Sequence, residues 1–353
     1  MTDCFSLLRP FIHRLPPETA HTAGLWALRQ GLLPSAPPLL LPSLRVDALG
    51  LTFANPIGLA AGFDKNAVAV DALLGQGFGF VEAGTVTPKS QAGNPRPRIF
   101  RLPEDEAVIN RLGFNNDGLA RFIEHFSQRD KTKGIAGANI GKNKDSVDAN
   151  ADYVTGLQAV YPHADYVTVN ISSPNTPNLR DLQQREKLVQ LLAALSLARQ
   201  ECVRTHARHI PILLKVAPDL SGQEMEDIAE AVLAHGIDGL IVSNTTITRP
   251  EHLKSRHRFE VGGLSGAPLF TLSTECLKRF YRLTGGKIIL VGAGGISSAE
   301  QAYAKVRAGA TLVQLYTALA YQGFSAVAHI RSGLAKLLEK DGFSRVQEAV
   351  GTS

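Results

Sequence analysis

The sequence predicts an α/β protein built as a (β/α)8 barrel, also called a TIM barrel, with an N-terminal two-helix extension. From about residue 50, short apolar runs rich in Val and Ile alternate with segments whose apolar residues recur at helical spacing. This pattern is typical of strands buried on both faces of a parallel sheet and of the helices that cover it. Eight such runs occur, which is the number of strands in this barrel. A doubly wound open sheet is the alternative fold.

The expected elements follow from these runs in order. The strands are expected at residues 57–61, 80–85, 135–140, 166–171, 212–216, 239–243, 288–292 and 311–315. The helices are expected at residues 68–74, 119–126, 149–159, 188–203, 224–234, 298–308 and 326–338. Ser221, with Glu224 three residues later, is a plausible N-cap for the fifth of these helices. A long insertion separates the second strand from the helix at 119–126.

Residues 1–45 differ from the rest and are expected to form a helical hairpin, with the barrel domain spanning residues 46–353. Phe5, Leu8, Ile12 and Leu15 give a first apolar stripe. Pro16-Pro17 ends that helix and can open a second one. The hairpin either packs on the barrel, as amphipathic helices commonly do, or dips into a membrane surface. The periodicity does not choose between the two.

The composition is that of an ordinary globular protein, because 44% of the 353 residues are hydrophobic and 20% are charged. Lys and Arg number 37 against 32 Asp and Glu. This mild basic excess suits an anionic small molecule or an acidic lipid surface, and we expect no nucleic-acid partner.

Other classes of site and location are disfavoured by the same sequence. Cys4, Cys202 and Cys276 are scattered, so we expect neither a disulfide framework nor a metal site. No window of eighteen apolar residues predicts a transmembrane helix. We also expect no secretory signal, since a continuous apolar core and a small-residue cleavage site are not found near residue 1.

Polar clusters follow most of the expected strands, where the ligand sites of α/β proteins lie. They are A-A-G-F-D-K-N (60–66), G-T-V-T-P (84–88), N-I-G-K-N (139–143), T-V-N-I-S-S-P-N-T-P-N-L-R (168–180), L-L-K-V-A-P-D (213–219) and S-N-T-T (243–246), with N-R-L-G-F-N-N (110–116) in the insertion. Each alone is explained by loop capping or, for Lys215, by a salt bridge. Their recurrence at one mouth of one barrel favours a binding site.

A glycine run follows the seventh strand and reads G-A-G-G-I-S-S from Gly292 to Ser298. It precedes an expected helix, so its backbone N–H groups are free to bind a phosphate. Barrels often bind phosphate after strands seven and eight. Together with Tyr316-Thr317 after the last strand, the run suggests a phosphate-bearing cofactor.

These motifs resemble the dihydroorotate dehydrogenases over about residues 45 to 320. The resemblance is carried in order by A-A-G-F-D-K-N, I-N-R-L-G-F-N-N, N-I-G-K-N-K, N-I-S-S-P-N-T-P-N-L-R, K-V-A-P-D-L, I-V-S-N-T-T, G-G-L-S-G-A-P-L and L-V-Q-L-Y-T. It implies an FMN enzyme that oxidises (S)-dihydroorotate to orotate in pyrimidine synthesis.

The resemblance also implies roles for individual residues. Ser173 would be the catalytic base that takes the C5 proton while hydride passes to flavin N5. FMN would be bound by Ala61, Gly62, Phe63, Asp64, Lys65, Thr85, Asn139, Asn170, Lys215, Ser243, Gly266, Gly295, Tyr316 and Thr317. The substrate would be bound by Lys65, Asn110, Arg111, Leu112, Gly113, Phe114, Asn170, Asn175, Asn244 and Thr245.

Two features resemble the quinone-reducing class 2 of this family. Ser173 stands where class 1 enzymes carry cysteine, and the N-terminal P-E-T-A-H and G-L-L-P look like the class 2 hairpin that forms a quinone tunnel. His21, Arg101 and Tyr316 are then the expected quinone contacts. The resemblance implies a monomer bound peripherally through residues 1–45 to the cytoplasmic face of a bacterial inner membrane, or alternatively to the inner mitochondrial membrane.

Three other functions remain open at this stage. A class 1 enzyme would pass electrons to fumarate or NAD, a tRNA dihydrouridine synthase would be another FMN barrel, and a membrane-associated binding protein would have no activity. Ser173 and the hairpin disfavour the first. The second needs a basic RNA-binding surface and a cysteine acid near the flavin, neither of which is visible. A protein that cannot be loaded with FMN would favour the third.

Overall fold

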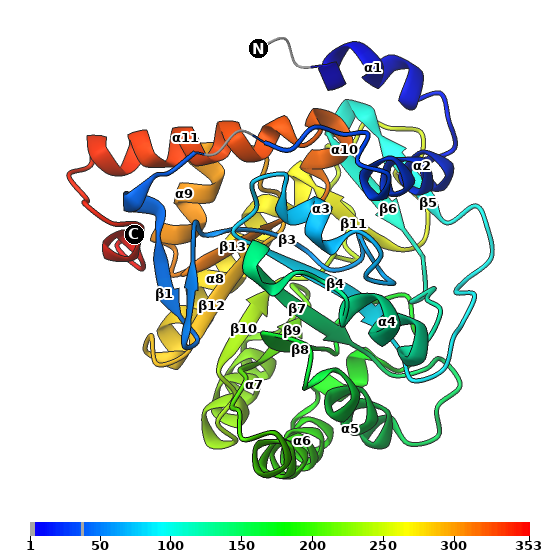
Figure 1. Cartoon of the computed structure of the whole chain (residues 1–353), viewed down its shortest axis with the longest axis vertical. Helices are drawn as coiled ribbons and strands as arrows, with labels where there is room; N and C mark the ends of the chain where they lie inside the picture. Colours follow the sequence, from blue (N-terminus) through cyan, green and yellow to red (C-terminus); the bar gives the residue numbers. More distant parts are fainter. Residues whose placement is uncertain (1–3, 37–38) are drawn as a thin grey trace.

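Eight parallel strands form a closed barrel in the computed structural model, which describes residues 4–36 and 39–353 (Figure 1). Their order around the barrel equals their order in the chain, and pairing of the last strand with the first closes the ring. The strands are β3 (Ile57–Leu59), β4 (Phe80–Val86), β7 (Ile135–Ile140), β8 (Tyr166–Asn170), β9 (Ile212–Val216), β10 (Gly239–Val242), β12 (Ile289–Ala293) and β13 (Leu312–Leu315). The (β/α)8 prediction is confirmed, and the open-sheet alternative is wrong.

Helices cover the outside of this barrel. They are α3 (Val70–Leu74), α4 (Leu119–Phe126), α5 (Ala149–Val160), α6 (Arg185–His206), α7 (Gly222–Ala234), α8 (Phe270–Thr284), α9 (Ala299–Arg307), α10 (Ala318–Gln322) and α11 (Ser325–Lys340). The expected Ser221–Glu224 capping box at α7 is present. The sequence analysis missed α8, which begins directly after the G-G-L-S-G-A-P-L motif, and the short α10. Single 3-10 turns lie at Pro42–Leu44, Pro103–Asp105, Lys131–Lys133, Arg180–Gln183, Ala267–Leu269 and Val346–Ala349.

Large rings fill the barrel interior near its amino end, and glycines on neighbouring strands make room for them. A Cβ on Gly58 would lie 2.2 Å from the Phe80 ring, and one on Gly137 would lie 2.1 Å from the Tyr166 ring. Interiors are packed to crystal-like density, so a methyl group at either glycine would displace a ring. The amino end of the barrel is therefore a closely packed core.

Two smaller sheets close the two ends of the barrel. The hairpin of β1 (Val46–Ala48) and β2 (Leu51–Phe53) reaches the amino end, where the Phe53 ring meets that of Phe80. At the carboxyl end, β5 (Ile99–Leu102), β6 (Ala107–Asn110) and β11 (Gly263–Gly266) form an antiparallel sheet in the order β11-β6-β5. The sequence analysis read β5 and β6 only as part of an insertion and did not predict β11. The sheet places one wall beside the mouth where the polar clusters gather.

The N-terminal segment, called the hairpin, contains the two expected helices, α1 (Cys4–Ile12) and α2 (Pro17–Arg29); α2 lies against β5, and α1 contacts α10 (Figure 1). Pro17 opens α2, as predicted. Glu18 fixes this helix to the barrel through a 2.6 Å ion pair with Arg98, whose side chain is buried. Among the described residues, no helix combines the length and apolar character needed to cross a membrane.

Candidate active site

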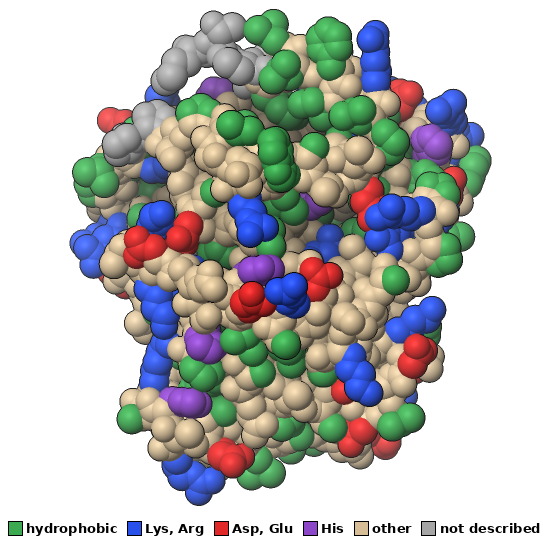
Figure 2. Space-filling model, turned by 45° about the vertical axis from the view of Figure 1, so that its right-hand side comes forward, with side chains coloured by type: hydrophobic (Ala, Val, Ile, Leu, Met, Phe, Trp, Pro, Cys, Tyr) green, Lys and Arg blue, Asp and Glu red, His purple; other side chains and the backbone are tan. Residues whose placement is uncertain are grey.

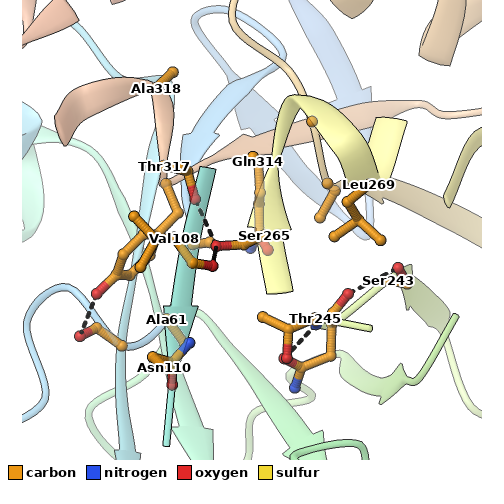
Figure 3. Close-up of a pocket in the computed structure, with 18 of the residues that line it drawn as sticks. Ala61, Val108, Asn110, Ser243, Thr245, Ser265, Leu269, Gln314, Thr317 and Ala318 are labelled. Carbon is orange, nitrogen blue, oxygen red and sulfur yellow. Dashed lines mark hydrogen bonds between the residues drawn. The ribbon is translucent and has the colours of Figure 1, made fainter. Parts of the chain in front are cut away.

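A deep cavity opens at the carboxyl ends of the barrel strands, with the β5-β6-β11 sheet as one wall (Figure 3). Counting its solvent-open mouth, the space measures about 1360 Å³. Most of the residues singled out in the sequence line it: Ala61, Gly62, Lys65, Thr85, Asn110, Leu112, Gly113, Phe114, Asn170, Ser173, Asn175, Lys215, Ser243, Asn244, Thr245, Gly266, Gly295, Tyr316 and Thr317.

Two of the expected cofactor residues, Phe63 and Asp64, lie outside the cavity. The Asp64 carboxylate accepts hydrogen bonds from the backbone N–H groups of Val68 and Ala69 at 2.9 and 2.8 Å, so it fixes the loop before α3. The Phe63 ring packs edge-on against His21. Both side chains shape the loop that carries Gly62 and Lys65 rather than facing the ligand space.

Asn139 and Arg111 also lie outside the cavity. Asn139 accepts a 2.6 Å hydrogen bond from the Thr85 hydroxyl and thereby orients a side chain that does line it. Arg111 pairs with Glu260 at 2.8 Å and stacks over the Phe100 ring at 4.5 Å. Its guanidinium thus ties the segment before β11 to the second sheet.

His21 and Arg101 join the hairpin to the barrel. His21 Nε2 lies 2.8 Å from the Phe63 carbonyl oxygen, and burial lowers the pKa of this histidine to about 4. The ring is therefore neutral at pH 7 with Nε2–H donating. Arg101 donates to the carbonyl oxygens of Leu15 and His13 at 3.0 and 3.3 Å. Of the three residues expected to contact a quinone, Tyr316 alone lines the cavity, with its hydroxyl donating to Gly62 O at 3.2 Å.

Amide side chains on three strand ends hold one another in place along the cavity wall. Asn170 Nδ2 donates to Thr85 Oγ1 at 3.0 Å, and Asn175 Nδ2 donates to Asn110 Oδ1 at 3.2 Å. Asn244 Nδ2 donates to the Ser172 hydroxyl at 2.9 Å. Because these groups are oriented before any ligand arrives, little conformational entropy is lost on binding.

Ser173 lies on the loop after β8, and its side chain is buried to 7% exposure. Its Oγ accepts a 3.3 Å hydrogen bond from the Asn175 N–H. The nearby Thr176 hydroxyl is buried with no hydrogen-bond partner among the described residues. A serine proton acceptor needs a route that carries the proton onward, and Thr176 offers an unused hydroxyl for that route.

Arg180 clamps the Ser173 loop and was given no role in the sequence analysis. Its guanidinium donates to the carbonyl oxygens of Ser172 and Thr245 at 3.0 and 2.9 Å, and it pairs with Asp219 at 2.8 Å. One side chain therefore joins the loops that follow β8, β9 and β10. The signal was present in the sequence, because Arg180 ends the quoted polar segment.

Two lysines bring positive charge to the cavity. Burial lowers the pKa of Lys215, against the opposing influence of Glu82, and among the described residues its ammonium has no hydrogen-bond acceptor. Lys65 Nζ donates to Gly62 O at 2.8 Å, and burial lowers its pKa to about 8. Buried cations without a close counter-ion are costly, so both lysines favour an anionic or electron-rich ligand.

Glu82 is the counter-charge beneath Lys215, and it is completely buried inside the barrel. Its carboxylate accepts from Asn139 at 2.7 Å, Thr168 and Gln314 at 3.0 Å, and Tyr166 at 3.1 Å. Four donors satisfy the oxygens of an ionised carboxylate.

Glu82→Gln is expected to lower the free energy of unfolding by about 2–4 kcal/mol, because a carboxamide turns N–H groups toward donors and leaves Lys215 without its counter-charge. Denaturant unfolding of the apoprotein measures this. Glu104→Gln, at an exposed glutamate, is the control and should change the free energy by less than about 0.5 kcal/mol. Equal unfolding energies for the two variants would contradict the assignment.

The loops after β12 and β13 form the end of the cavity that suits a phosphate. Gly294 and Gly295 have φ angles of 102° and 75°, and a Cβ on Gly295 would lie 2.5 Å from Phe270 Cα. In the described parts of the chain, the N–H groups of Gly294, Gly295 and Thr317 make no hydrogen bond. Thr317 Oγ1 donates to Ser265 Oγ at 2.9 Å on the facing wall (Figure 3). Unpaired N–H groups in this position are a ready phosphate site.

Polar atoms without partners mark the middle of the cavity. Thr245 Oγ1 and Gln314 Oε1 are buried and have no hydrogen-bond partner among the described residues. Native structures leave few such atoms, so these two await a ligand with its own donors and acceptors. Small residues such as Ala61 and Gly62 leave room for a flat ring system. The residues present therefore fit a planar, heteroatom-rich ring with a phosphate tail, as in FMN.

Several lining residues were given no individual role in the sequence analysis, and only some of them, such as Ile99 of β5 and Val108 of β6, come from elements that it did not predict. These lining residues are Ala60, Ile99, Glu106, Val108, Ser265, Ala267, Leu269, Ala293, Gly294, Ile296, Ser297, Gln314, Ala318, Tyr321 and Gln322. Ser265 and Gln314 stood inside quoted motifs and could have been chosen as polar residues at the ends of apolar runs. The apolar residues of β5 and β6 carried no such signal.

Taken together, the barrel and its site have the features of an enzyme whose carboxyl mouth suits a planar, phosphate-bearing cofactor and a small anionic substrate. Comparison with known proteins gives the family. The family model described as "Dihydroorotate dehydrogenase" matches residues 43–338. This chain belongs to the dihydroorotate dehydrogenase family, whose members are flavin-dependent in general.

Near-full-length relatives give the class. "Dihydroorotate dehydrogenase (quinone)" of Azorhizobium caulinodans is 53% identical over 351 residues, covering 99% of each chain. The protein of the same name from Parvibaculum lavamentivorans is 54% identical over 349 residues, covering 99% of this chain and 98% of its own. A crystal structure of the Eimeria tenella enzyme in complex with ferulenol has a TM-score of 0.92 and 42% identity, covering 95% of each chain. The class 2 resemblance is confirmed.

Proposed function

We propose that this protein oxidises (S)-dihydroorotate to orotate with FMN as its cofactor and passes the electrons to a membrane quinone, a step of pyrimidine synthesis. The family and the relatives' names support the reaction. The observation that carries the chemistry is the presence in one cavity of a buried serine, a ring of oriented amides and two lysines.

FMN would be held by groups from all parts of the cavity mouth. Gly295 and Thr317 would bind its phosphate through backbone N–H groups, and Lys215 would lie against the ring, where it favours negative charge. When bound, FMN supplies the two-electron chemistry, taking hydride from the substrate and giving electrons to the quinone. The remaining work is done by side chains of this chain.

Dihydroorotate would bind among the amides and Lys65. The substrate carries a carboxylate, for which Lys65 supplies a positive charge. It also presents N–H and C=O groups, which suit side chains that both donate and accept. Asn110, Asn175 and Asn244, together with Asn170 and Thr245, fix its orientation relative to Ser173.

Ser173 would take the C5 proton at its Oγ. A serine hydroxyl is a weak base, so the loop must position it and relay its own proton as the new one arrives. The Arg180 clamp and the Asn175 N–H fix the hydroxyl, and Thr176 Oγ1, which is buried without a hydrogen-bond partner among the described residues, is the candidate group for the relay. Phe114 lines the same cavity and excludes water.

Lys65 makes binding of the product, orotate, dependent on pH. In the ligand-free protein its pKa is lowered to about 8 by burial, so the lysine is charged below pH 8 and neutral above it. A bound carboxylate favours the charged form. Orotate binding, measured by perturbation of the flavin spectrum, should therefore be constant below about pH 7 and weaken above pH 8, by up to about tenfold per pH unit.

Lys65→Met should weaken orotate binding at pH 7 and remove this dependence between pH 7 and 10. A retained weakening above pH 8 in that variant would assign the titration to another group. Lys144→Met, at an exposed lysine outside the cavity, provides the matched control.

The hairpin presents an apolar surface that suits a lipid bilayer. Leu7, Phe11, Trp26 and Leu32 are 65%, 64%, 59% and 61% exposed, and hydrophobic side chains gather over this end of the molecule in Figure 2. Patches of this kind mark interaction sites. We propose that this surface holds the protein, as a monomer, on the cytoplasmic face of a bacterial inner membrane, with the inner mitochondrial membrane as the alternative.

A quinone would reach the flavin from beneath the same hairpin. The cavity extends to Ile99, Tyr321 and Gln322, and the hairpin lies over these elements, since Arg9 donates to Tyr321 O at 3.2 Å and His13 Nε2 lies 2.9 Å from Ala320 O. Tyr316 would stand between quinone and flavin. In this proposal His21 and Arg101 border the quinone path and fix the hairpin that covers it.

Anaerobic mixing tests the whole proposal. Dihydroorotate should bleach the absorbance of the bound flavin, and a short-chain quinone should restore it. Bleaching that fumarate or NAD reverses, but quinone does not, would indicate a class 1 acceptor. A protein that loads FMN but is not bleached would lack the proposed substrate, and failure to load FMN would leave only a binding function.

A further inference from the structure

Lys305 is a lysine in the interior that none of the roles above uses. It lies on α9, the helix that follows the glycine turn, and its side chain is 0% exposed. Its Nζ donates to Ser273 Oγ at 2.6 Å and lies 5.2 Å from the centre of the Phe270 ring. Among the described residues, no carboxylate lies within ion-pair distance of it. A buried cation with only a hydroxyl and a ring for partners is expensive unless an anion balances it.

The surroundings of Lys305 contain little other charge. Burial lowers its pKa to about 7, and the one titratable group with a noticeable influence on it is the buried Cys276 thiol of α8. On the β12 side the contact is made by Gly292. Arg307 and Asp341, on α9 and after α11, pair with each other at 3.8 Å. The protein itself therefore offers Lys305 no counter-ion.

Ser273 connects this lysine to the phosphate end of the cavity. Its Oγ lies 3.1 Å from the carbonyl oxygens of both Gly294 and Phe270. A Cβ on Gly294 would lie 2.8 Å from the same Oγ, which shows how closely the turn packs on the serine. Gly294 and Gly295 line the cavity. One serine thus separates the ammonium of Lys305 from the turn whose free N–H groups face the ligand.

We propose that Lys305 is a positioning residue for the cofactor phosphate: it supplies a buried positive charge behind the Gly294–Gly295 turn and acts on the phosphate through Ser273 and the turn without touching it. This inference rests on the proposed function, since it assumes that a phosphate-bearing flavin occupies the cavity. A phosphate monoester carries about −1.5 to −2 charges at pH 7. Without Lys305, the described part of this site would balance the phosphate charge with backbone N–H dipoles alone.

The role predicts a proton uptake. In the apoprotein near pH 8 Lys305 is largely neutral, because burial has lowered its pKa. A phosphate behind the turn favours the charged form, so FMN binding at pH 8 should take up a proton at Lys305. At pH 6 the lysine is already charged, and that uptake should vanish. Riboflavin, which has the same ring and no phosphate, should cause no uptake at either pH.

The test compares FMN with riboflavin on the apoprotein. Lys305→Met should weaken FMN binding about tenfold to a hundredfold, as measured by quenching of flavin fluorescence, and leave riboflavin binding unchanged. Calorimetry at pH 8 in two buffers of different ionisation enthalpy should lose the FMN-dependent proton uptake in this variant. Lys340→Met, at an exposed lysine of α11, should behave as the unaltered protein.

Several outcomes would overturn the inference. If Lys305→Met weakens the binding of FMN and of riboflavin equally, Lys305 has a structural role only. If this variant binds FMN as tightly as the unaltered protein, Lys305 has no role in phosphate binding. If Lys305→Met does not fold, Ser273→Ala is the deciding variant, because it removes the hydroxyl that connects Lys305 to the glycine turn. This variant should lower the ratio of FMN affinity to riboflavin affinity. An unchanged ratio would refute the proposal. An unaltered apoprotein that binds no FMN would instead refute the proposed function, so the two failures are distinguishable.

Discussion

Ser173→Ala should bind FMN normally and slow flavin reduction by dihydroorotate by about two to four orders of magnitude, the range that a positioned proton acceptor contributes. Ser173 lines the cavity beside the amides and accepts from the Asn175 N–H, and among the described residues its side chain makes no other hydrogen bond. Removing Oγ therefore removes the proton acceptor and little else. Anaerobic stopped-flow measurement of a single turnover separates this step from quinone reduction.

Two companion variants sharpen the Ser173 experiment. Ser127→Ala, at an exposed serine that caps the end of α4, should reduce flavin at the rate of the unaltered protein. Thr176→Val should give an intermediate loss if its hydroxyl relays the proton. Single-turnover reduction by Ser173→Ala within about threefold of the unaltered rate would remove Ser173 from the base role.

The barrel could be predicted from the sequence because each of its strands is marked by an apolar pattern within the strand itself. Each buried parallel strand must be a short apolar run, so all eight were placed to within about two residues. The second sheet could not be predicted in the same way. Its strands β5, β6 and β11 form ladders of only four residue pairs each, and β11 (Gly263–Gly266) is half glycine. Such strands owe their form to pairing with distant partners, which periodicity does not report.

Site residues could be predicted where the side chain points into the barrel mouth. They could not be predicted where neighbouring side chains on one loop point in different directions. In the segment from Gly62 to Lys65, Gly62 and Lys65 line the cavity, whereas Phe63 packs on the hairpin and Asp64 turns back to fix the loop. A motif gives the residues of a loop but not the direction of each side chain. The turn geometry that decides this is set by backbone hydrogen bonds to residues elsewhere.

Buried charged residues were the hardest feature to predict from the sequence. Lys215 could be recognised because it ends an apolar strand, but Lys305 stands in A-Y-A-K-V-R, which reads as an ordinary amphipathic helix with an exposed lysine. Only the packing of α9 against α8 encloses it. Tertiary structure, rather than local pattern, thus decides which charges face a ligand.

Removing residues 1–33 should lower quinone turnover at least about a hundredfold while flavin reduction by dihydroorotate keeps its rate, because the deletion removes the surface that brings quinone to the cavity and no residue that lines it. The deletion ends before Pro34, whose carbonyl accepts from Gln76, so the link that runs onto the barrel is retained. Stopped-flow bleaching and steady-state quinone reduction measure the two half-reactions on the same preparation.

A point variant distinguishes loss of the hairpin from loss of its docking. Glu18 bridges Arg96 and Arg98 at 3.0 and 2.6 Å, and Glu18→Ala leaves the buried Arg98 without its carboxylate, which should loosen α2 on β5. Quinone turnover should then fall less than in the deletion, and binding to anionic lipid vesicles should persist because Leu7, Phe11 and Trp26 remain. Arg45→Ala, whose ion pair with Asp47 is exposed, should leave both half-reactions unchanged. A folded deletion protein with full quinone turnover would show that quinone reaches the flavin by another route, and the hairpin would then serve attachment alone.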